Sequence, residues 1–159
     1  MSSLAFVALG SNLGDRRGTL EGAVAALAGT YGVVVRKVSS FHETEPIGGP
    51  AGQGLFLNAA AVLETTLDPF GLLRVLREIE ERFGRTRTVH WGERTLDLDL
   101  LLFDDRIIDT PELTIPHPRL TERRFVLEPL AEVAPDAVDP VTKRTIVDLL
   151  ANVVARKSR

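Results

Sequence analysis

The chain has 159 residues, which suits one domain, and its 44% apolar and 26% charged content is ordinary for a folded soluble protein. A net charge of −3 argues against broad binding to nucleic acids or anionic membranes, and the absence of cysteine excludes disulfides and thiolate metal sites. The start of the chain lacks a basic segment and no apolar run reaches membrane-spanning length. We therefore expect a cytoplasmic protein without a signal peptide, folded as a single domain over residues 1–159.

The first half of the chain alternates strand and helix patterns. Residues 4–9 form an apolar run that predicts a buried strand. Apolar residues then recur at helical spacing and predict a helix that Gly32 ends: Leu20, Ala23, Val24, Leu27 and Tyr31. Strands are predicted over residues 33–41 and 55–63. The glycine-rich segment between them predicts either a mobile flap or a plain surface loop.

The second half begins with a helix signal, because Asp68 and Pro69 are typical of an N-cap and a first helical residue. The apolar face of this helix runs to Gly84 and contains Leu72, Leu76, Ile79 and Phe83. A strand is predicted over 97–103, an irregular stretch over 111–118, and a last helix from a capping box at Thr145 and Asp148. This order predicts an α+β fold, a ferredoxin-like sandwich with helices on one face of an antiparallel sheet.

Residues 85–103 carry most of the functional information. Asp97 and Asp99 are two residues apart on a predicted strand, so both carboxylates share one face while the flanking leucines face the core. An isolated Asp-x-Asp pair is more often a solvated strand face. Here an apolar strand follows, and ionised side chains at its start need partners that a divalent metal would supply.

Three arginines precede this strand within ten residues: Arg85, Arg87 and Arg94. Most arginines are simply surface charge, but planar guanidinium groups beside paired carboxylates suit a phosphate chain. The segment therefore predicts a site for Mg²⁺ carrying a polyphosphate.

Several motifs occur together along the chain. They are residues 8–15 (Ala-Leu-Gly-Ser-Asn-Leu-Gly-Asp), 39–41 (Ser-Ser-Phe), 44–48 (Thr-Glu-Pro-Ile-Gly), 56–60 (Phe-Leu-Asn-Ala-Ala), 84–87 and 91–99 (Trp-Gly-Glu-Arg-Thr-Leu-Asp-Leu-Asp), 115–118 (Ile-Pro-His-Pro) and 123–125 (Arg-Arg-Phe). No one of them is decisive, but in this order and spacing the chain resembles the 6-hydroxymethyl-7,8-dihydropterin pyrophosphokinase family over nearly its whole length. The resemblance implies transfer of the two terminal phosphates of ATP to the hydroxymethyl group of a reduced pterin, with AMP released and two Mg²⁺ ions as cofactors.

The resemblance also implies residue roles at the phosphate end of the site. Asp97 and Asp99 would hold both Mg²⁺ ions, and Arg85 and Arg94 would act on the phosphates during transfer. Nucleotide contacts are implied for Glu80, Arg87, Arg94, His117 and Arg123. From pattern alone Glu80 would be solvated and His117 an ordinary loop histidine.

Pattern and resemblance together predict the pterin end of the site. Phe56 and Asn58 share one strand face, although Phe56 could be core and Asn58 a strand-end amide. An asparagine amide both donates and accepts, which matches the amide-like edge of a pterin, and Phe125 offers a second stacking wall. The resemblance implies pterin contacts by Thr44, Ile47, Phe56, Asn58, Trp91 and Phe125.

Two other functions share parts of this pattern. A ferredoxin-like RNA-binding module would need aromatic residues on its central strands and a basic sheet face, which the net charge and 6% aromatic content disfavour. A metal-dependent phosphohydrolase would share the aspartate pair but would release phosphate from ATP without a pterin. We expect a monomer that binds ATP and a reduced pterin and that binds neither nucleic acid nor membrane.

Overall fold

The computed structural model describes residues 2–12, 14–44, 55–83 and 96–157. Within these ranges one antiparallel sheet contains β1 (Ser3–Ser11), β2 (Val33–Val38), β3 (His42–Thr44), β4 (Phe56–Thr65) and β5 (Asp97–Phe103). The strand order is β2-β4-β1-β5, with β3 also paired to β4. Helix α1 (Arg16–Ala28) follows β1 and helix α2 (Pro69–Arg82) follows β4. This is the ferredoxin-like arrangement that the order of elements predicted.

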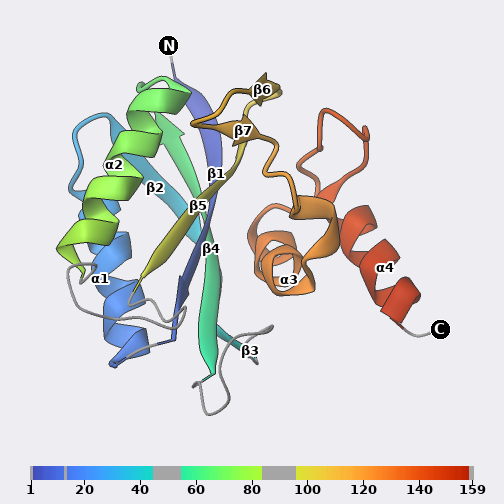
Figure 1. Ribbon diagram of the computed structural model, residues 1–159, viewed down its shortest axis with the longest axis horizontal. Helices are drawn as coiled ribbons and strands as arrows, with labels where there is room; N and C mark the ends of the chain where they lie inside the picture. Colours follow the sequence, from blue (N-terminus) through green and yellow to red (C-terminus); the bar gives the residue numbers. More distant parts are fainter. Residues whose placement is uncertain (1, 13, 45–54, 84–95, 158–159) are drawn as a thin grey trace.

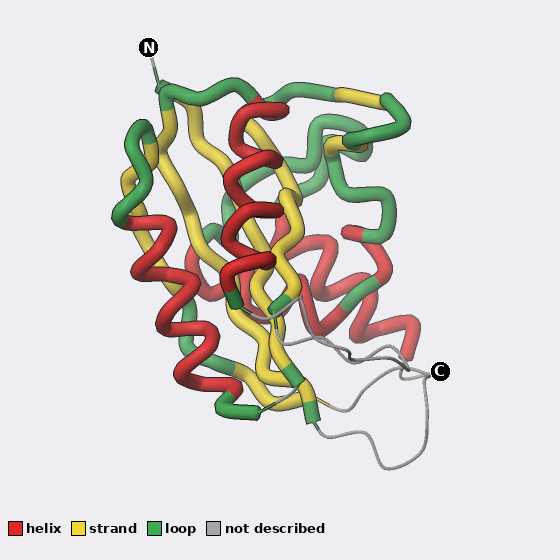
Figure 2. Tube along the Cα trace, turned by 60° about the vertical axis from the view of Figure 1, so that its left-hand side comes forward, coloured by secondary structure: helices red, strands yellow, loops and turns green. Residues whose placement is uncertain are grey.

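Helices cover both faces of the sheet (Figures 1 and 2), so the prediction of helices on one face was wrong. Helices α1 and α2 pack on the face that carries Val7 and Leu9, and α3 (Arg124–Val133) lies over the face that carries Phe6 and Ala8. Helix α4 (Ile146–Lys157) joins the second core. The physical reason is that β1 is apolar at successive positions, so both of its faces need cover.

Helix α3 was not predicted from the sequence. Val126, Leu127, Leu130 and Val133 are buried at helical spacing, but Pro129 lies inside the helix. Proline has no N–H to bond the carbonyl one turn earlier, so a proline within an apolar pattern is normally read as a break.

The remaining differences lie at element ends and in the segment expected to be irregular. Helix α1 ends at Ala28, and Tyr31, which the periodicity placed on its apolar face, is 95% exposed. Gly32 instead supplies a φ of 85° in the turn before β2. The predicted strand 33–41 breaks after Val38, and Thr114–Ile115 of the segment expected to be irregular forms β7, which pairs with β6 (Ile108–Asp109).

The predicted helix caps are present. The Asp68 carboxylate accepts a hydrogen bond from Gly71 N at 2.6 Å, and Thr145 Oγ1 accepts one from Asp148 N at 3.2 Å. No helix in the described ranges is both long and apolar enough to cross a membrane.

Candidate active site

Polar side chains form a row across one end of the sheet, on the face that α3 covers. Asp97 on β5 is paired with Gly10 on β1, and Gly10 is paired with Asn58 on β4. Directly opposed residues of antiparallel strands point to the same face. Neighbouring strands are ~4.8 Å apart, so the Cα atoms of Asp97 and Asn58 are separated by about 10 Å. A carboxylate and an amide therefore share one surface with a glycine between them.

Asp99 lies on the same face, two residues further along β5, where it is paired with Ala8. Both aspartates are half-buried, whereas Leu98 and Leu100 point the other way into the core beneath α2. The alternation predicted for this strand is thus present.

A cavity of ≈ 750 Å³ lies over this row. It brings together seven of the residues predicted from the sequence: Thr44, Phe56, Asn58, Asp97, Asp99, Arg123 and Phe125. They come from β3, β4, β5 and the start of α3. The predicted residues Ile47, Arg85, Arg87, Trp91 and Arg94 and the glycine-rich segment 48–54 lie outside the described residues.

One end of the cavity suits a flat heterocycle with a polar edge. Phe56 and Phe125 supply aromatic surface, and buried Asn58 donates from Nδ2 to Thr44 Oγ1 at 2.6 Å. A Cβ at Gly10 would lie 3.2 Å from Asn58 Oδ1, tighter than most carbon contacts. Glycine at this position therefore keeps the floor between the amide and the aspartates open.

The part of the cavity formed by residues 119–128 is rich in arginine. Arg119 and Arg124 line it beside Arg123, together with Glu122 and Glu128, and none of these four was predicted. Arg124 Nε donates to Glu128 Oε2 at 3.0 Å, and the Arg123 guanidinium lies 5.6 Å from the centre of the Phe125 ring. Helix α3 begins here without a side-chain cap, so its positive end adds to a rim that suits an anion. The only sequence signal for these residues was the cluster of arginines just before Phe125.

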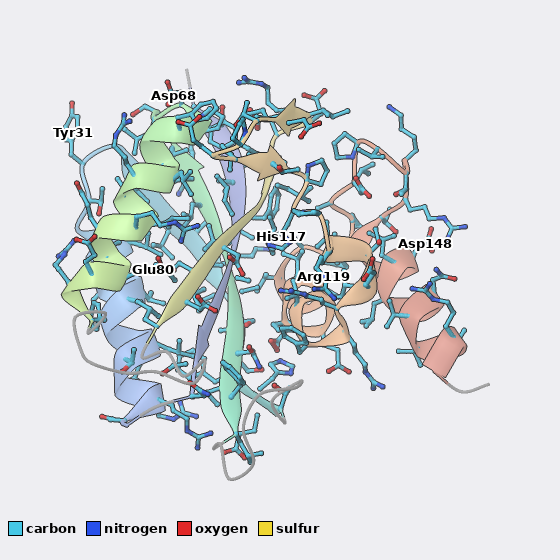
Figure 3. The ribbon with its side chains drawn as sticks, in the orientation of Figure 1. Tyr31, Asp68, Glu80, His117, Arg119 and Asp148 are labelled. Atoms are coloured by element: carbon cyan, nitrogen blue, oxygen red, sulfur yellow. The ribbon has the colours of Figure 1, made fainter. Side chains whose placement is uncertain are left out.

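His117 does not line the cavity but lies between the sheet and α3, near Arg119 (Figure 3). Its Nδ1 accepts a hydrogen bond from Arg119 N at 3.2 Å, so the neutral ring carries its proton on Nε2. Burial lowers the pKa of His117, nearby Asp99 raises it, and Arg123 and Arg119 lower it further, with a net lowering. The ring is thus neutral near pH 7 and offers Nε2–H as a donor.

Glu80 lies on α2, across the sheet from the cavity (Figure 3), and it is buried rather than solvated as the pattern alone predicted. Its Oε2 accepts from Leu98 N at 2.8 Å and its Oε1 accepts from Arg77 at 2.9 Å. Arg77 also donates to Leu98 O at 3.0 Å. Since β5 is at the edge of the sheet, these two side chains bind backbone groups that a neighbouring strand would otherwise bind. They fix the residue between Asp97 and Asp99.

The donor set at the aspartates fits magnesium. No group of three or more His, Cys, Asp or Glu residues that could hold a metal occurs in the described part of the chain. Magnesium does not require one, because it is commonly held by one or two carboxylates, with substrate phosphates and water as the other ligands. Asp97 and Asp99, which line a cavity together with several arginines, match that mode.

The chain is similar in sequence to pyrophosphokinases from several bacteria. The family model for 7,8-dihydro-6-hydroxymethylpterin-pyrophosphokinase matches residues 6–135. The 2-amino-4-hydroxy-6-hydroxymethyldihydropteridine pyrophosphokinase of Bacillus subtilis (strain 168) is 52% identical over 133 residues, which is 84% of this chain and 79% of that protein. The protein of the same name from Synechocystis is 45% identical over 149 residues, 94% of this chain and 75% of that one.

A solved structure agrees with the fold. The crystal structure of wild-type Plasmodium falciparum HPPK-DHPS superposes with a TM-score of 0.76 at 17% identity, covering 98% of this chain and 45% of that longer one. At this identity the likeness concerns the fold alone. From the family model and the close relatives, the chain belongs to the 7,8-dihydro-6-hydroxymethylpterin-pyrophosphokinase family.

Proposed function

We propose that this chain transfers the pyrophosphoryl group of ATP to the hydroxymethyl group of 6-hydroxymethyl-7,8-dihydropterin, forming AMP and the pterin diphosphate used in folate biosynthesis. The observation that carries the proposal is that one cavity joins the Phe56, Asn58 and Phe125 surface to the Asp97 and Asp99 pair. A heterocycle bound at the first place would direct a short substituent toward the second.

At the pterin end, Phe56 and Phe125 would stack on the two faces of the ring, which offset aromatic contacts favour. Asn58 would bind the polar edge, and its bond to Thr44 fixes the orientation of the amide. Ile47 and Trp91 are proposed to complete this pocket.

At the phosphate end, Asp97 and Asp99 would hold two Mg²⁺ ions. Bound Mg²⁺ supplies charge neutralisation and alignment of the phosphate oxygens. Arg123 and the Nε2–H of His117 would contact the triphosphate, and Arg85, Arg87 and Arg94 are proposed to complete the set of donors. Charge stabilisation by these donors would supply most of the rate, as in other phosphoryl transfers. Glu80 would support the nucleotide site from the other face of the sheet, because it holds Leu98 between the two aspartates.

In the transfer step, the hydroxymethyl oxygen attacks the β-phosphorus of ATP and the bond from that phosphorus to the α–β bridging oxygen breaks. AMP leaves with the bridging oxygen. We assign acceptance of the hydroxyl proton to Asp97, which lies in the same row of the sheet as Asn58.

Product analysis tests this function. With ATP, Mg²⁺ and the pterin, AMP and pterin diphosphate should form together, and no ADP should appear at any time. A phosphohydrolase would release inorganic phosphate equally fast without pterin. An RNA-binding module would show no turnover and would bind RNA in a salt-sensitive manner.

The same proposal covers the setting of the reaction. We propose a monomer with one catalytic domain over residues 1–159. The absence of cysteine fits a reducing compartment, and we propose the cytoplasm.

Two substitutions of His117 should have different effects. His117→Asn keeps an acceptor for Arg119 N but loses the outward donor, whereas His117→Gln keeps a donor near the Nε2 position. A hydrogen bond to a charged group contributes roughly 1.5–3 kcal/mol, so the Asn variant should raise the KM for ATP at least about tenfold. The Gln variant should raise it less. The reverse order in steady-state kinetics would show that His117 acts only by holding Arg119.

Replacing Glu80 by alanine should weaken the start of β5. The change leaves Leu98 N and Arg77 without their buried acceptor, which should lower the free energy of unfolding by about 2 kcal/mol and speed hydrogen exchange at Leu98. Glu80→Gln retains an acceptor for Leu98 N, so its free energy of unfolding should fall by less. Glu78→Ala, at an exposed position of the same helix, is the control and should change stability by no more than about 0.5 kcal/mol. Unchanged exchange at Leu98 in Glu80→Ala would contradict this role.

A further inference from the structure

The Ser39-Ser40-Phe41 motif forms a break between β2 and β3, both of which pair with β4. Ser39 maintains the sheet at this break. Its N–H donates to Ala60 O at 2.9 Å, and its Oγ accepts from Ala60 N at 2.9 Å. The backbone of β4 therefore stays bonded where the partner strand is interrupted, and the chain can turn its next residue toward α3.

Ser40 binds α3 through Glu132. Its N–H donates to Glu132 Oε1 at 2.8 Å, and its hydroxyl lies 2.9 Å from Oε1 and 2.7 Å from Oε2. His42 Nε2 lies 3.5 Å from the same carboxylate and 3.3 Å from Ser40 Oγ. These hydrogen bonds, that of the Ser40 hydroxyl foremost, lower the pKa of Glu132, so the carboxylate is ionised at neutral pH. We call Ser40, His42 and Glu132 the latch.

The latch connects α3 to the segment that leads into β3, and both α3 and β3 contribute residues to the cavity lining. On α3, Phe125, Glu128 and Glu132 are three and four residues apart and share one helix face, and the first two line the cavity. On the other side, β3 has three residues, and its Thr44 holds the Asn58 amide. A three-residue strand has few ladder bonds of its own, so a charged tie to a neighbouring helix matters for its position.

His42 lies in the same row as the site. It is paired with Asn58, which is paired with Gly10, which is paired with Asp97. The latch thus ends one strand away from the amide proposed to bind the pterin.

We propose that the latch is a positioning element for the pterin: Glu132 fixes β3 and Thr44 relative to α3 and Phe125, and so sets the separation between the pocket walls. This inference rests on the proposed function and deepens it. Glu132 does not line the cavity, and it acts on the pterin through Thr44 and Phe125. Losing the latch should cost pterin binding without altering the phosphate end.

The test is steady-state kinetics of Glu132→Ala, with both substrates varied. We expect the KM for pterin to rise about tenfold, which corresponds to about 1.4 kcal/mol, while kcat and the KM for ATP stay within about twofold. Glu132→Gln retains one acceptor for Ser40, so its KM for pterin should lie between those of Glu132→Ala and the wild type. Ser40→Ala retains the backbone N–H bond, and its KM for pterin should also be intermediate. The double variant Ser40→Ala/Glu132→Ala should resemble Glu132→Ala alone, because both changes remove one interaction.

Glu64→Ala is the matched control. Glu64 lies on β4, the strand that carries Asn58, but near the end of the strand away from the cavity, where it binds Ser2 and Arg36. It should alter thermal stability without changing the KM for pterin. Should Glu132→Ala fail to fold, Ser40→Ala alone should still raise the KM for pterin about threefold, less than the loss of a full charged hydrogen bond.

Three outcomes would overturn the latch: an unchanged KM for pterin in folded Glu132→Ala, an equal rise in the KM for ATP, or additive effects in the double variant. These differ from failure of the proposed function, in which the wild-type chain itself would not convert the pterin. Calorimetric titration of the pterin in the presence of a non-hydrolysable ATP analogue and Mg²⁺ should reproduce the KM differences as differences in Kd.

Discussion

Replacing Asp97 or Asp99 by asparagine should abolish most of the turnover while the fold stays intact. Asparagine keeps the size of the side chain and removes the charge that a divalent cation needs. Loss of about 4 kcal/mol of charge stabilisation in the transition state slows a reaction about 10³-fold. The measurement is kcat over a range of Mg²⁺ concentrations, with circular dichroism as the check on folding.

Asp105→Asn is the control for this experiment. Asp105 is exposed in the turn that follows β5 and does not line the cavity, so the variant loses one carboxylate close in sequence without touching the site. It should retain wild-type turnover. Near-normal kcat in folded Asp97→Asn and Asp99→Asn would rule out these residues as the metal ligands.

Replacing Asn58 by leucine should affect the other substrate. Leucine has a similar shape and fills the buried position, but it offers no donor or acceptor to the pterin edge. A site built to hydrogen-bond a polar edge binds its substrate much more weakly when that pairing is lost. The KM for pterin should therefore rise at least about 100-fold. The KM for ATP should change little, because Asn58 lies two strands from Asp97.

Two further variants calibrate the Asn58 result. Thr44→Val removes the hydroxyl that orients the amide and should raise the KM for pterin by about tenfold, as expected for one hydrogen bond. Asn152→Leu, at an exposed position on α4, should leave both KM values unchanged. Equal KM values for pterin in Asn58→Leu and wild type would place the pterin elsewhere.

The parts of the fold predicted from the sequence are those in which local pattern and environment agree. The alternation of aspartate and leucine in 97–100 specified both faces at the start of β5, and Asp68 with Pro69 specified the start of α2. Helix α3 was missed because Pro129 interrupts a pattern that tertiary packing nevertheless holds helical. Helices also cover the second face of the sheet, as the continuous apolar run in β1 requires. The run alone does not say which elements pack on each face.

The site was predictable where residue type alone implies chemistry, as for the aspartate pair and for Asn58 on an apolar strand. Other contributions depend on register and distance. Gly10 matters because the pairing of three strands places it between Asn58 and Asp97. Glu80 binds the backbone of Leu98, and Ser40 binds a carboxylate 92 residues away, so neither interaction leaves a local pattern in the sequence.

The site of attack on ATP is tested most directly by following its phosphorus atoms. Parallel reactions with ATP labelled at the α- or the γ-phosphate, with Mg²⁺ and 6-hydroxymethyl-7,8-dihydropterin, would be separated by chromatography. Attack at the β-phosphorus predicts that all γ-label enters the pterin product and all α-label remains in AMP, with neither conversion occurring without pterin. Label from the γ-phosphate in a pterin monophosphate beside ADP, or in inorganic phosphate regardless of pterin, would contradict attack at the β-phosphorus.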